Sequence, residues 1–224
     1  MAKIEIIISR HGQTDANAQR IFQGALVNYP LNDTGRRQAA ALAESLKDKK
    51  IDWIVTSQFD RAIETAGHVA AHHPQAPASI DERLQEISWG IADGKYIDDV
   101  DHLVDPVVDK WYAGDFDACV PQGETPNSCR ARTMAAFADI LAMARQNKYS
   151  TVFVNTHGRT LRIIMSLLMD KDLHNMKKYG HTNCSYHVVS TEIDDQDDVQ
   201  TSLDPMDLPF KLEQLDVRDH LRAL

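Results

Sequence analysis

Residues 3–12, KIEIIISRHG, decide the fold class of this chain. The β-branched run over residues 3–9 is continuous instead of alternating with polar residues, which is typical of a strand buried on both faces of a parallel or mixed sheet. The run ends at a charged turn, Arg10-His11-Gly12. Because ligands bind beyond the carboxyl ends of strands in open α/β sheets, this turn is a candidate part of a functional site.

Beyond this strand, the sequence alternates between helical and extended patterns. Apolar residues at helical spacing predict helices over about residues 33–49, 61–72, 126–146 and 158–169. Apolar runs predict strands over about residues 52–57, 151–156, 184–190 and 210–217. Weak periodicity with several Gly and Pro residues over 82–124 predicts an irregular, partly helical lid. We therefore expect one α/β domain, residues 1–224, with a central mixed, mostly parallel sheet flanked by helices and a lid inserted at about residues 87–123.

The composition is that of an ordinary globular protein. Of 224 residues, 43% are hydrophobic, which is enough to form one substantial core. With 24 basic and 33 acidic residues, the formal net charge of −9 argues against binding to nucleic acid or to an anionic membrane. Three widely spaced cysteines indicate no disulfide framework, and no apolar stretch is long enough for a signal peptide or a membrane span. We expect a cytoplasmic protein, with a homo-oligomer as an open alternative to a monomer.

Polar or cationic residues follow three of the predicted buried strands. Arg10 and His11 follow the first strand, Arg61 lies just beyond the second, and His157 follows the strand over residues 151–156. These side chains are expected to converge on one crevice, where guanidinium forks match phosphoryl oxygens bidentately. A neutral histidine held in one tautomer can attack phosphorus directly. The sequence therefore predicts a phosphoryl site that needs neither a metal nor a serine nucleophile.

Five ordered blocks carry a resemblance to a known family. The blocks are residues 10–14 with Asn17, 31–39, 56–66, 84–90 and 156–158, and the pair His220-Leu221 lies near the end of the chain. Together they resemble the histidine phosphatase superfamily, also called phosphoglycerate mutase-like, and the ending is similar to its phosphatase branch. The resemblance spans nearly the whole chain and implies the fold predicted above.

The resemblance implies a role for each matching residue. His11 would be the phosphoryl-accepting nucleophile, and Glu86 would protonate the leaving oxygen and later take a proton from water. The phosphoryl oxygens would be held by Arg10, Arg61 and His157. Further substrate-binding positions would be Asn17, Gln23, Thr156 and Gly158. The implied enzyme hydrolyses a small phosphorylated molecule without a metal or other cofactor.

Several residues allow a second interpretation. The carboxylates of Asp81, Glu82 and Asp93 lie near Glu86 in sequence and could replace it, and Asp93 stands where many relatives carry a glutamate. His68 and His72 have a metal-binding spacing, but without a third ligand an exposed helix face is favoured. Three aromatic residues could line a pocket or pack the lid: Trp89, Trp111 and Phe116. The cysteines have no charge-rich setting and are predicted to be inert: Cys119, Cys129 and Cys184.

Three functions fit this pattern: a phosphatase, a phosphoglycerate mutase and a non-catalytic phospho-ligand binding module. The binding module ranks last because His11 and Glu86 are both present. The lid separates the first two, since residues 93–117 contain eight aspartates against two lysines and no arginine. Such a lid is expected to repel a multiply charged acid, which favours a phosphatase with a neutral or cationic leaving group. The acidic run over 192–198 is predicted to be a solvated loop.

Overall fold

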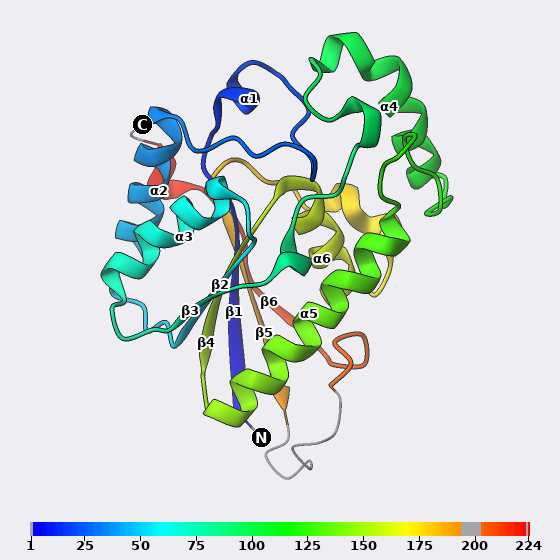
Figure 1. Ribbon diagram of the computed structural model, residues 1–224. Coiled ribbons are helices and arrows are strands. Elements are labelled where there is room, and N and C mark those ends of the chain that lie inside the picture. The colour runs from blue at the N-terminus through cyan, green and yellow to red at the C-terminus, as the bar shows by residue number, and fades with distance from the viewer. Residues whose placement is uncertain (1, 194–202, 223) are drawn as a thin grey trace.

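The computed structural model describes residues 2–193, 203–222 and 224 (Figure 1). Its six-stranded sheet has the strand order β3-β2-β4-β1-β5-β6. The strands are β1 (Ala2–Arg10), β2 (Trp53–Thr56), β3 (Ala78–Ile80), β4 (Thr151–Thr156), β5 (Tyr186–Ile193) and β6 (Lys211–Val217). The pairs within β1–β4 are parallel, whereas β5 runs antiparallel to both of its neighbours. The predicted mixed, mostly parallel sheet is confirmed.

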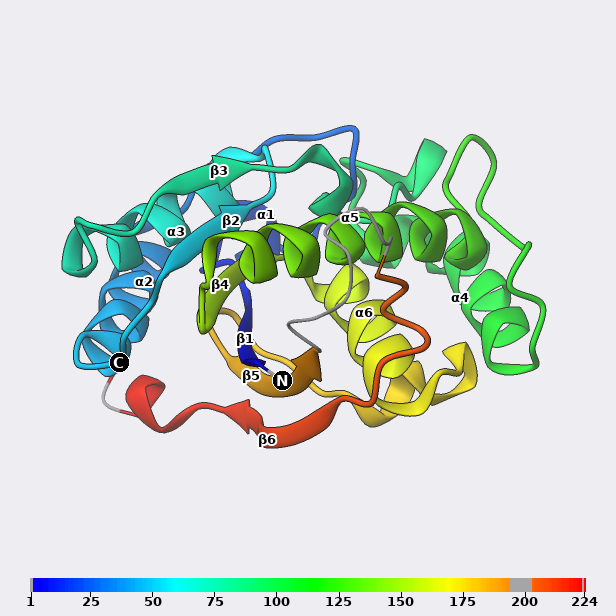
Figure 2. The same cartoon turned by 90° about the horizontal axis from the view of Figure 1, so that it is seen from below.

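Helices cover both faces of this sheet. They are α1 (Asp15–Ala18), α2 (Asp33–Leu46), α3 (Asp60–His72), α4 (Ile97–Tyr112), α5 (Pro126–Asn147) and α6 (Gly158–Asp170). Figure 2 shows α2 and α3 on one side of the sheet and α5 and α6 on the other. Short 3-10 turns connect several elements, at Glu82–Leu84, Gly90–Ala92, Leu173–Lys178 and Asp219–Leu221.

The β-branched run of β1 supplies side chains to both faces. Ile4, Ile6 and Ile8 belong to the hydrophobic cluster that includes α5 and α6, while Ile7 belongs to the cluster that includes α2 and α3. Successive side chains of a strand point to opposite faces, so a strand covered on both sides must be apolar throughout. Each buried isoleucine stabilises the fold by about 1.5–3 kcal/mol.

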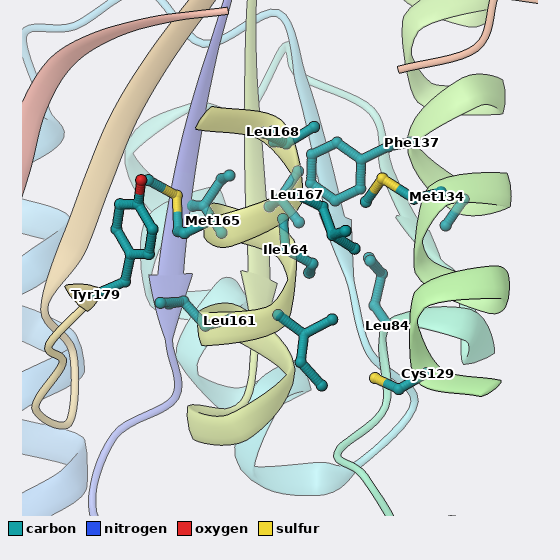
Figure 3. Packing of buried hydrophobic residues seen from close by; sticks show 14 of the residues in the cluster. Leu84, Cys129, Met134, Phe137, Leu161, Ile164, Met165, Leu167, Leu168 and Tyr179 are labelled. Carbon is teal, nitrogen blue, oxygen red and sulfur yellow. The ribbon is translucent and has the colours of Figure 1, made fainter. Parts of the chain in front are cut away.

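The packing of α5 against α6 fixes one side of the sheet's carboxyl edge. Phe137 and Met134 of α5 point toward α6, where Ile164 lies on the facing surface (Figure 3). Leu84 fills the space between the two helices near their site-facing ends (Figure 3). This packing holds the N-terminus of α6 in place, directly after the end of β4.

The lid differs from the irregular segment that the sequence predicts. Its main element, α4, is a regular 16-residue helix with Pro106 inside it. Val100, Val104 and Trp111 form its buried stripe and belong to the same cluster as α5 and α6. The sequence did not predict this helix because a proline lies inside it and glycines flank it, and both residue types are typical of irregular segments. The shared cluster fits one core for lid and sheet.

Two further differences concern strands. The edge strand β3 was not predicted, because it is only three residues long, largely exposed and poor in β-branched residues. The strand predicted from residue 184 begins at Tyr186, since Cys184 has a positive φ of 59°. Of the acidic run over 192–198, the first two residues end β5 and the others lie outside the described residues. In the part of the chain that the structure describes, no helix is long and apolar enough to cross a membrane.

Candidate active site

The predicted convergence of strand ends occurs at one edge of the sheet. Arg10 at the end of β1 pairs in register with Thr156 at the end of β4, and the chain continues from them into His11 and His157. The backbone N–H of His11 donates to the Thr156 carbonyl at 3.1 Å. The two histidine rings consequently lie with their centroids 5.1 Å apart.

His11 is held as a neutral ring with one free nitrogen. Its Nδ1 lies 2.7 Å from the carbonyl oxygen of Gly12, so Nδ1 carries the proton and donates it. Burial, followed by the positive charges of Arg61 and Arg10, lowers the pKa of His11 well below its usual value. The side chain is 3% exposed and lines a cavity of about 260 Å³. Its Nε2 therefore keeps a lone pair, which is the state a nucleophile requires.

The backbone around His11 packs tightly against the start of α2. A Cβ on Gly12 would lie 2.6 Å from the carbonyl oxygen of Gly35, and a Cβ on Gly35 would lie even closer to the carbonyl oxygen of Gln13. The N–H of Gly12 also donates to Thr65 Oγ1 at 3.0 Å. Only glycine at both positions permits this approach, which fixes the turn that carries His11.

Arg61 and His157 lie behind His11 and do not line the cavity. His157 Nδ1 accepts from Arg61 Nε at 3.1 Å, which leaves His157 Nε2 to donate to Ser57 Oγ at 2.8 Å. The remaining Arg61 donors reach the backbone oxygens of Val27 and Gly24, at 3.2 and 3.3 Å. Burial lowers the pKa of Arg61 to about 10, which leaves it cationic at neutral pH. The two side chains thus form a charged layer beneath His11.

Glu86 is the carboxylate of the cavity wall, and it caps helix α6. Its Oε1 accepts from the N–H and the hydroxyl of Thr160 at 2.9 and 3.0 Å, and from the N–H of Ile87 at 3.0 Å. Among the described residues, one donor reaches its Oε2, the N–H of Arg159 at 3.0 Å. A carboxylate is a favourable cap for a helix N-terminus, and Oε2 has room for a further hydrogen-bond partner.

The three carboxylates considered as substitutes for Glu86 lie elsewhere. Asp81 forms an ion pair with Arg83, and Glu82 is exposed. Asp93 accepts from the N–H groups of Gly24 and Leu26 at 2.8 and 3.1 Å, so it holds a loop. None of the three lines the cavity.

Other predicted binding residues divide into two groups. Asn17 and Gln23 line the cavity, and so does Gly158, where a Cβ would come within 2.7 Å of the His181 ring. Turning the Gln23 amide by half a turn lets its oxygen accept from Arg61 at 2.9 and 3.0 Å. Thr156 is buried outside the cavity, and its hydroxyl donates to the carbonyl of Leu84 at 2.7 Å. Its position is that of a structural residue.

Arg10 offers an unused donor. Its Nη1 donates to His181 Nδ1 at 3.3 Å, while its buried Nε has no partner among the described residues. Nearby, Asn183 donates to Oδ1 of Asn17 and to the carbonyl of His11, each at 3.1 Å. Asn17 is thereby oriented with its oxygen engaged, so its amide N–H groups are available to a ligand.

The sequence reading missed three cationic or imidazole groups of the cavity: Arg159, Arg162 and His181. The two arginines lie three residues apart on α6, so a helical projection would have shown that they share one face of that helix. His181 lies in a loop before β5, and no local sequence pattern indicates that it reaches the cavity. Burial, with Arg10 nearby, lowers the pKa of His181 to about 2, so its ring is neutral.

The lid aspartates do not face this cavity, which corrects the expectation drawn from their number. Seven of the eight are exposed, and the eighth, Asp93, holds the loop described above. None lines the cavity. The charge of the lid therefore gives no reason to exclude an acidic substrate. The expectation failed because the sequence alone does not show to which side α4 turns its acidic face.

The structure also places the aromatic, cysteine and histidine side chains for which the sequence allowed two interpretations. Trp89 lines the cavity. The ring of Trp111 stacks on the ring of Trp89 with their centroids 5.4 Å apart, and Phe116 packs against the core. Burial raises the pKa of the Cys129 thiol to about 12, which fits an inert cysteine. Within the described residues, no cluster of His, Cys, Asp or Glu side chains could hold a metal ion, and this includes the face of α3 with His68 and His72.

Comparisons with known proteins find relatives of this chain in sequence and in fold. A family model described as histidine phosphatase superfamily (branch 1) matches residues 6–201. The chain is 26% identical to the probable phosphoglycerate mutase GpmB of Enterobacter sp. (strain 638), and 28% identical to that of Klebsiella pneumoniae (strain 342). Each alignment covers 182 residues, 81% of this chain and 82% of the relative.

Solved structures with the same fold include a mycobacterial glucosyl-3-phosphoglycerate phosphatase, with a TM-score of 0.81 and 23% identity over 96% of this chain and 99% of that one. Another is YhfR of Bacillus stearothermophilus, with a TM-score of 0.79 and 24% identity over 98% of this chain and 100% of that one. A third is a putative alpha-ribazole-5'-P phosphatase of Escherichia coli, with a TM-score of 0.76 and 21% identity over 97% and 98% of the two chains.

Proposed function

Because this chain belongs to branch 1 of the histidine phosphatase superfamily, we propose that it hydrolyses phosphate monoesters through a phosphohistidine on His11. The observation that carries the proposal is the neutral His11 ring, whose Nδ1 is engaged by Gly12 and whose Nε2 is open to the cavity. Arg10 and Asn17 offer N–H donors beside it. Fixed donors of this kind stabilise charge that builds on phosphoryl oxygens.

In the first step, the lone pair of His11 Nε2 attacks phosphorus and the bond to the leaving oxygen breaks. Glu86 gives its proton to that oxygen, from Oε2, which has only one hydrogen-bond partner among the described residues. This step uses Glu86 in its protonated form, which the second step restores. Arg61 and His157 stabilise the step from behind the ring, through a buried positive charge that needs no rearrangement.

In the second step, water attacks the phosphorus of phosphohistidine and Glu86 takes the proton that water releases. The nitrogen–phosphorus bond breaks, inorganic phosphate leaves, and His11 returns to its neutral form. The chain itself supplies the cations that a metal would otherwise provide, so the proposed reaction is independent of divalent metal.

The second candidate function is a phosphoglycerate mutase. The sequence relatives named above are probable phosphoglycerate mutases, and the positive charges of Arg159 and Arg162 at the cavity would help to retain an acidic acceptor. A mutase returns the phosphoryl group to a bound acceptor, whereas a phosphatase transfers it to water.

One experiment tests the mechanism and separates the two functions. Enzyme mixed with labelled phosphomonoester and quenched without acid should carry an acid-labile, base-stable label on the peptide with His11, and His11→Asn should carry none. Labelled enzyme is then divided between buffer alone and buffer with glycerate. Release as inorganic phosphate in both supports the phosphatase, and transfer to glycerate supports the mutase. Label on another residue, or full activity of His11→Asn, contradicts the mechanism.

A further inference from the structure

Arg159 and Arg162 form a pair of positive charges that the proposed reaction does not use. They lie three residues apart on α6, so both project from the same face of the helix, and both line the cavity. We call them the α6 arginine pair. The backbone N–H of Arg159 also donates to Oε2 of Glu86, the oxygen from which the proposed reaction protonates the leaving group.

Aromatic groups position the α6 arginine pair, without any carboxylate. The guanidinium carbon of Arg159 lies 5.5 and 5.6 Å from the ring centroids of Trp89 and Trp111. The hydroxyl of Tyr112 lies 3.5 Å from Nη1 of Arg159 and also hydrogen-bonds Arg162. Among the described residues, no carboxylate oxygen lies within ion-pair distance of either guanidinium.

Two partly buried arginines outside the cavity do have carboxylate partners. Arg132 binds both oxygens of Glu124, at 2.6 and 2.8 Å, and Arg83 binds Asp81 and Asp139. Two unpaired like charges on one helical turn repel each other, and burial with that repulsion lowers the pKa of Arg162. An anion bound between them would relieve this cost.

We propose that the α6 arginine pair binds a second anionic group, a carboxylate or a phosphate, on the leaving group of the substrate. This inference rests on the proposed phosphatase function and names its substrate class: small phosphomonoesters with at least one further anionic group. The cavity of about 260 Å³ suits a small molecule. Phe22 and Trp89 line the same cavity and can contact the carbon skeleton between the two anionic groups.

The test compares three substrates of similar size. Glycerol 3-phosphate has a neutral leaving group, 3-phosphoglycerate adds a carboxylate, and propane-1,3-diyl bisphosphate adds a second phosphate. We expect kcat/KM for phosphate release to be at least tenfold higher for one or both anionic substrates, and the better of the two identifies the group. Arg159→Gln and Arg162→Gln should each remove most of this preference, with less than threefold loss on glycerol 3-phosphate.

Matched variants keep the result interpretable. Arg130→Gln removes the same charge from an exposed position on α5 and should leave the preference intact. Arg159→Lys and Arg162→Lys retain the charge and should keep part of the preference for anionic substrates. Their activity also shows that variants at these positions fold. Equal kcat/KM for all three substrates, or equal losses on all three in the Gln variants, overturns the substrate class. If phosphohistidine still forms on His11 in that case, the proposed function stands and only this inference fails.

Discussion

His11, Arg61 and His157 form a buried floor at the cavity, whereas Arg159, Arg162 and His181 form a half-buried rim. Each floor residue is fixed by bonds to backbone or to another floor residue, at the ends of strands or at the start of α3. Among the rim residues, Arg159 packs on the rings of Trp89 and Trp111 and lies near the hydroxyl of Tyr112, and His181 accepts a hydrogen bond from Arg10. The residues to which we assign the chemistry are thus held at the edge of the sheet, whereas those to which we assign substrate choice lie on one helix and in a loop.

The largest effect expected from a single change at the boundary between floor and rim is that of Glu86→Gln. Loss of the proton donor should lower kcat on an alkyl phosphate by about 10²–10⁴-fold. On p-nitrophenyl phosphate, whose leaving group needs no proton, we expect a rapid burst of p-nitrophenol followed by slow turnover, because dephosphorylation still needs the base.

Glu82→Gln serves as the control. It makes the same change at an exposed position two residues after the end of β3 and should retain full activity. Pre-steady-state absorbance measures the burst. Equal losses on both substrates without a burst would mean that Glu86 only caps α6.

Asp93→Asn tests whether the floor depends on the lid. The carboxylate uses separate oxygens for Gly24 and Leu26, so an amide would place an NH2 group against one backbone N–H. We expect a loss of about 1–3 kcal/mol in the free energy of unfolding. Because the carbonyl of Gly24 holds Arg61, kcat/KM should also fall by about tenfold.

Urea titrations and steady-state assays measure these two effects. Asp99→Asn makes the same change at an exposed lid position and should alter neither. Wild-type kinetics in Asp93→Asn would show that the floor is fixed without help from the lid.

The pH dependence of stability compares the neutral histidines of floor and rim. His181 has a lowered pKa of about 2, and its unfolded value is about 6.5. Above pH 6.5 the ring is neutral in both states, so it has no effect. As pH falls below 6.5, the unfolded chain binds a proton that the folded chain excludes, and stability decreases.

At pH 5.5 this costs about 1.4 kcal/mol for His181 relative to pH 7.5 or above, and His11 and His157 act in the same direction. Urea unfolding at pH 7.5, 6.5 and 5.5 measures the loss, and His181→Gln should show a smaller one. Equal stability of wild type across this range would mean that the three rings protonate freely in the folded protein.

The smallest expected effect is that of chelation. Since Arg10 and Arg61 supply positive charge at the phosphoryl site, exhaustive dialysis against EDTA should change kcat by less than twofold. A magnesium-dependent phosphatase treated in parallel provides the positive control. Activity lost on chelation and restored by magnesium would show that the floor lacks sufficient charge of its own.

The floor could be predicted from sequence because its parts are local. A β-branched run and the turn after it are contiguous in residues 3–12, and parallel strands bring such turns together. The rim could not be predicted in the same way. The direction of the acidic face of α4 depends on which stripe of that helix is buried, and His181 reaches the cavity only through tertiary folding.

The close contact between Gly12 and Gly35 has a consequence for mutational tolerance. In a library that samples every substitution, both positions should be depleted of all side chains, although Gly35 lies on a helix that contributes no side chain to the cavity. Gly67 on α3 provides the contrast, because a Cβ there meets nothing within 4 Å. Alanine at Gly67 should be tolerated and even enriched under heat selection, since it stabilises a helix by about 0.5–1 kcal/mol. A depletion map would thus trace the backbone contact that holds the nucleophile.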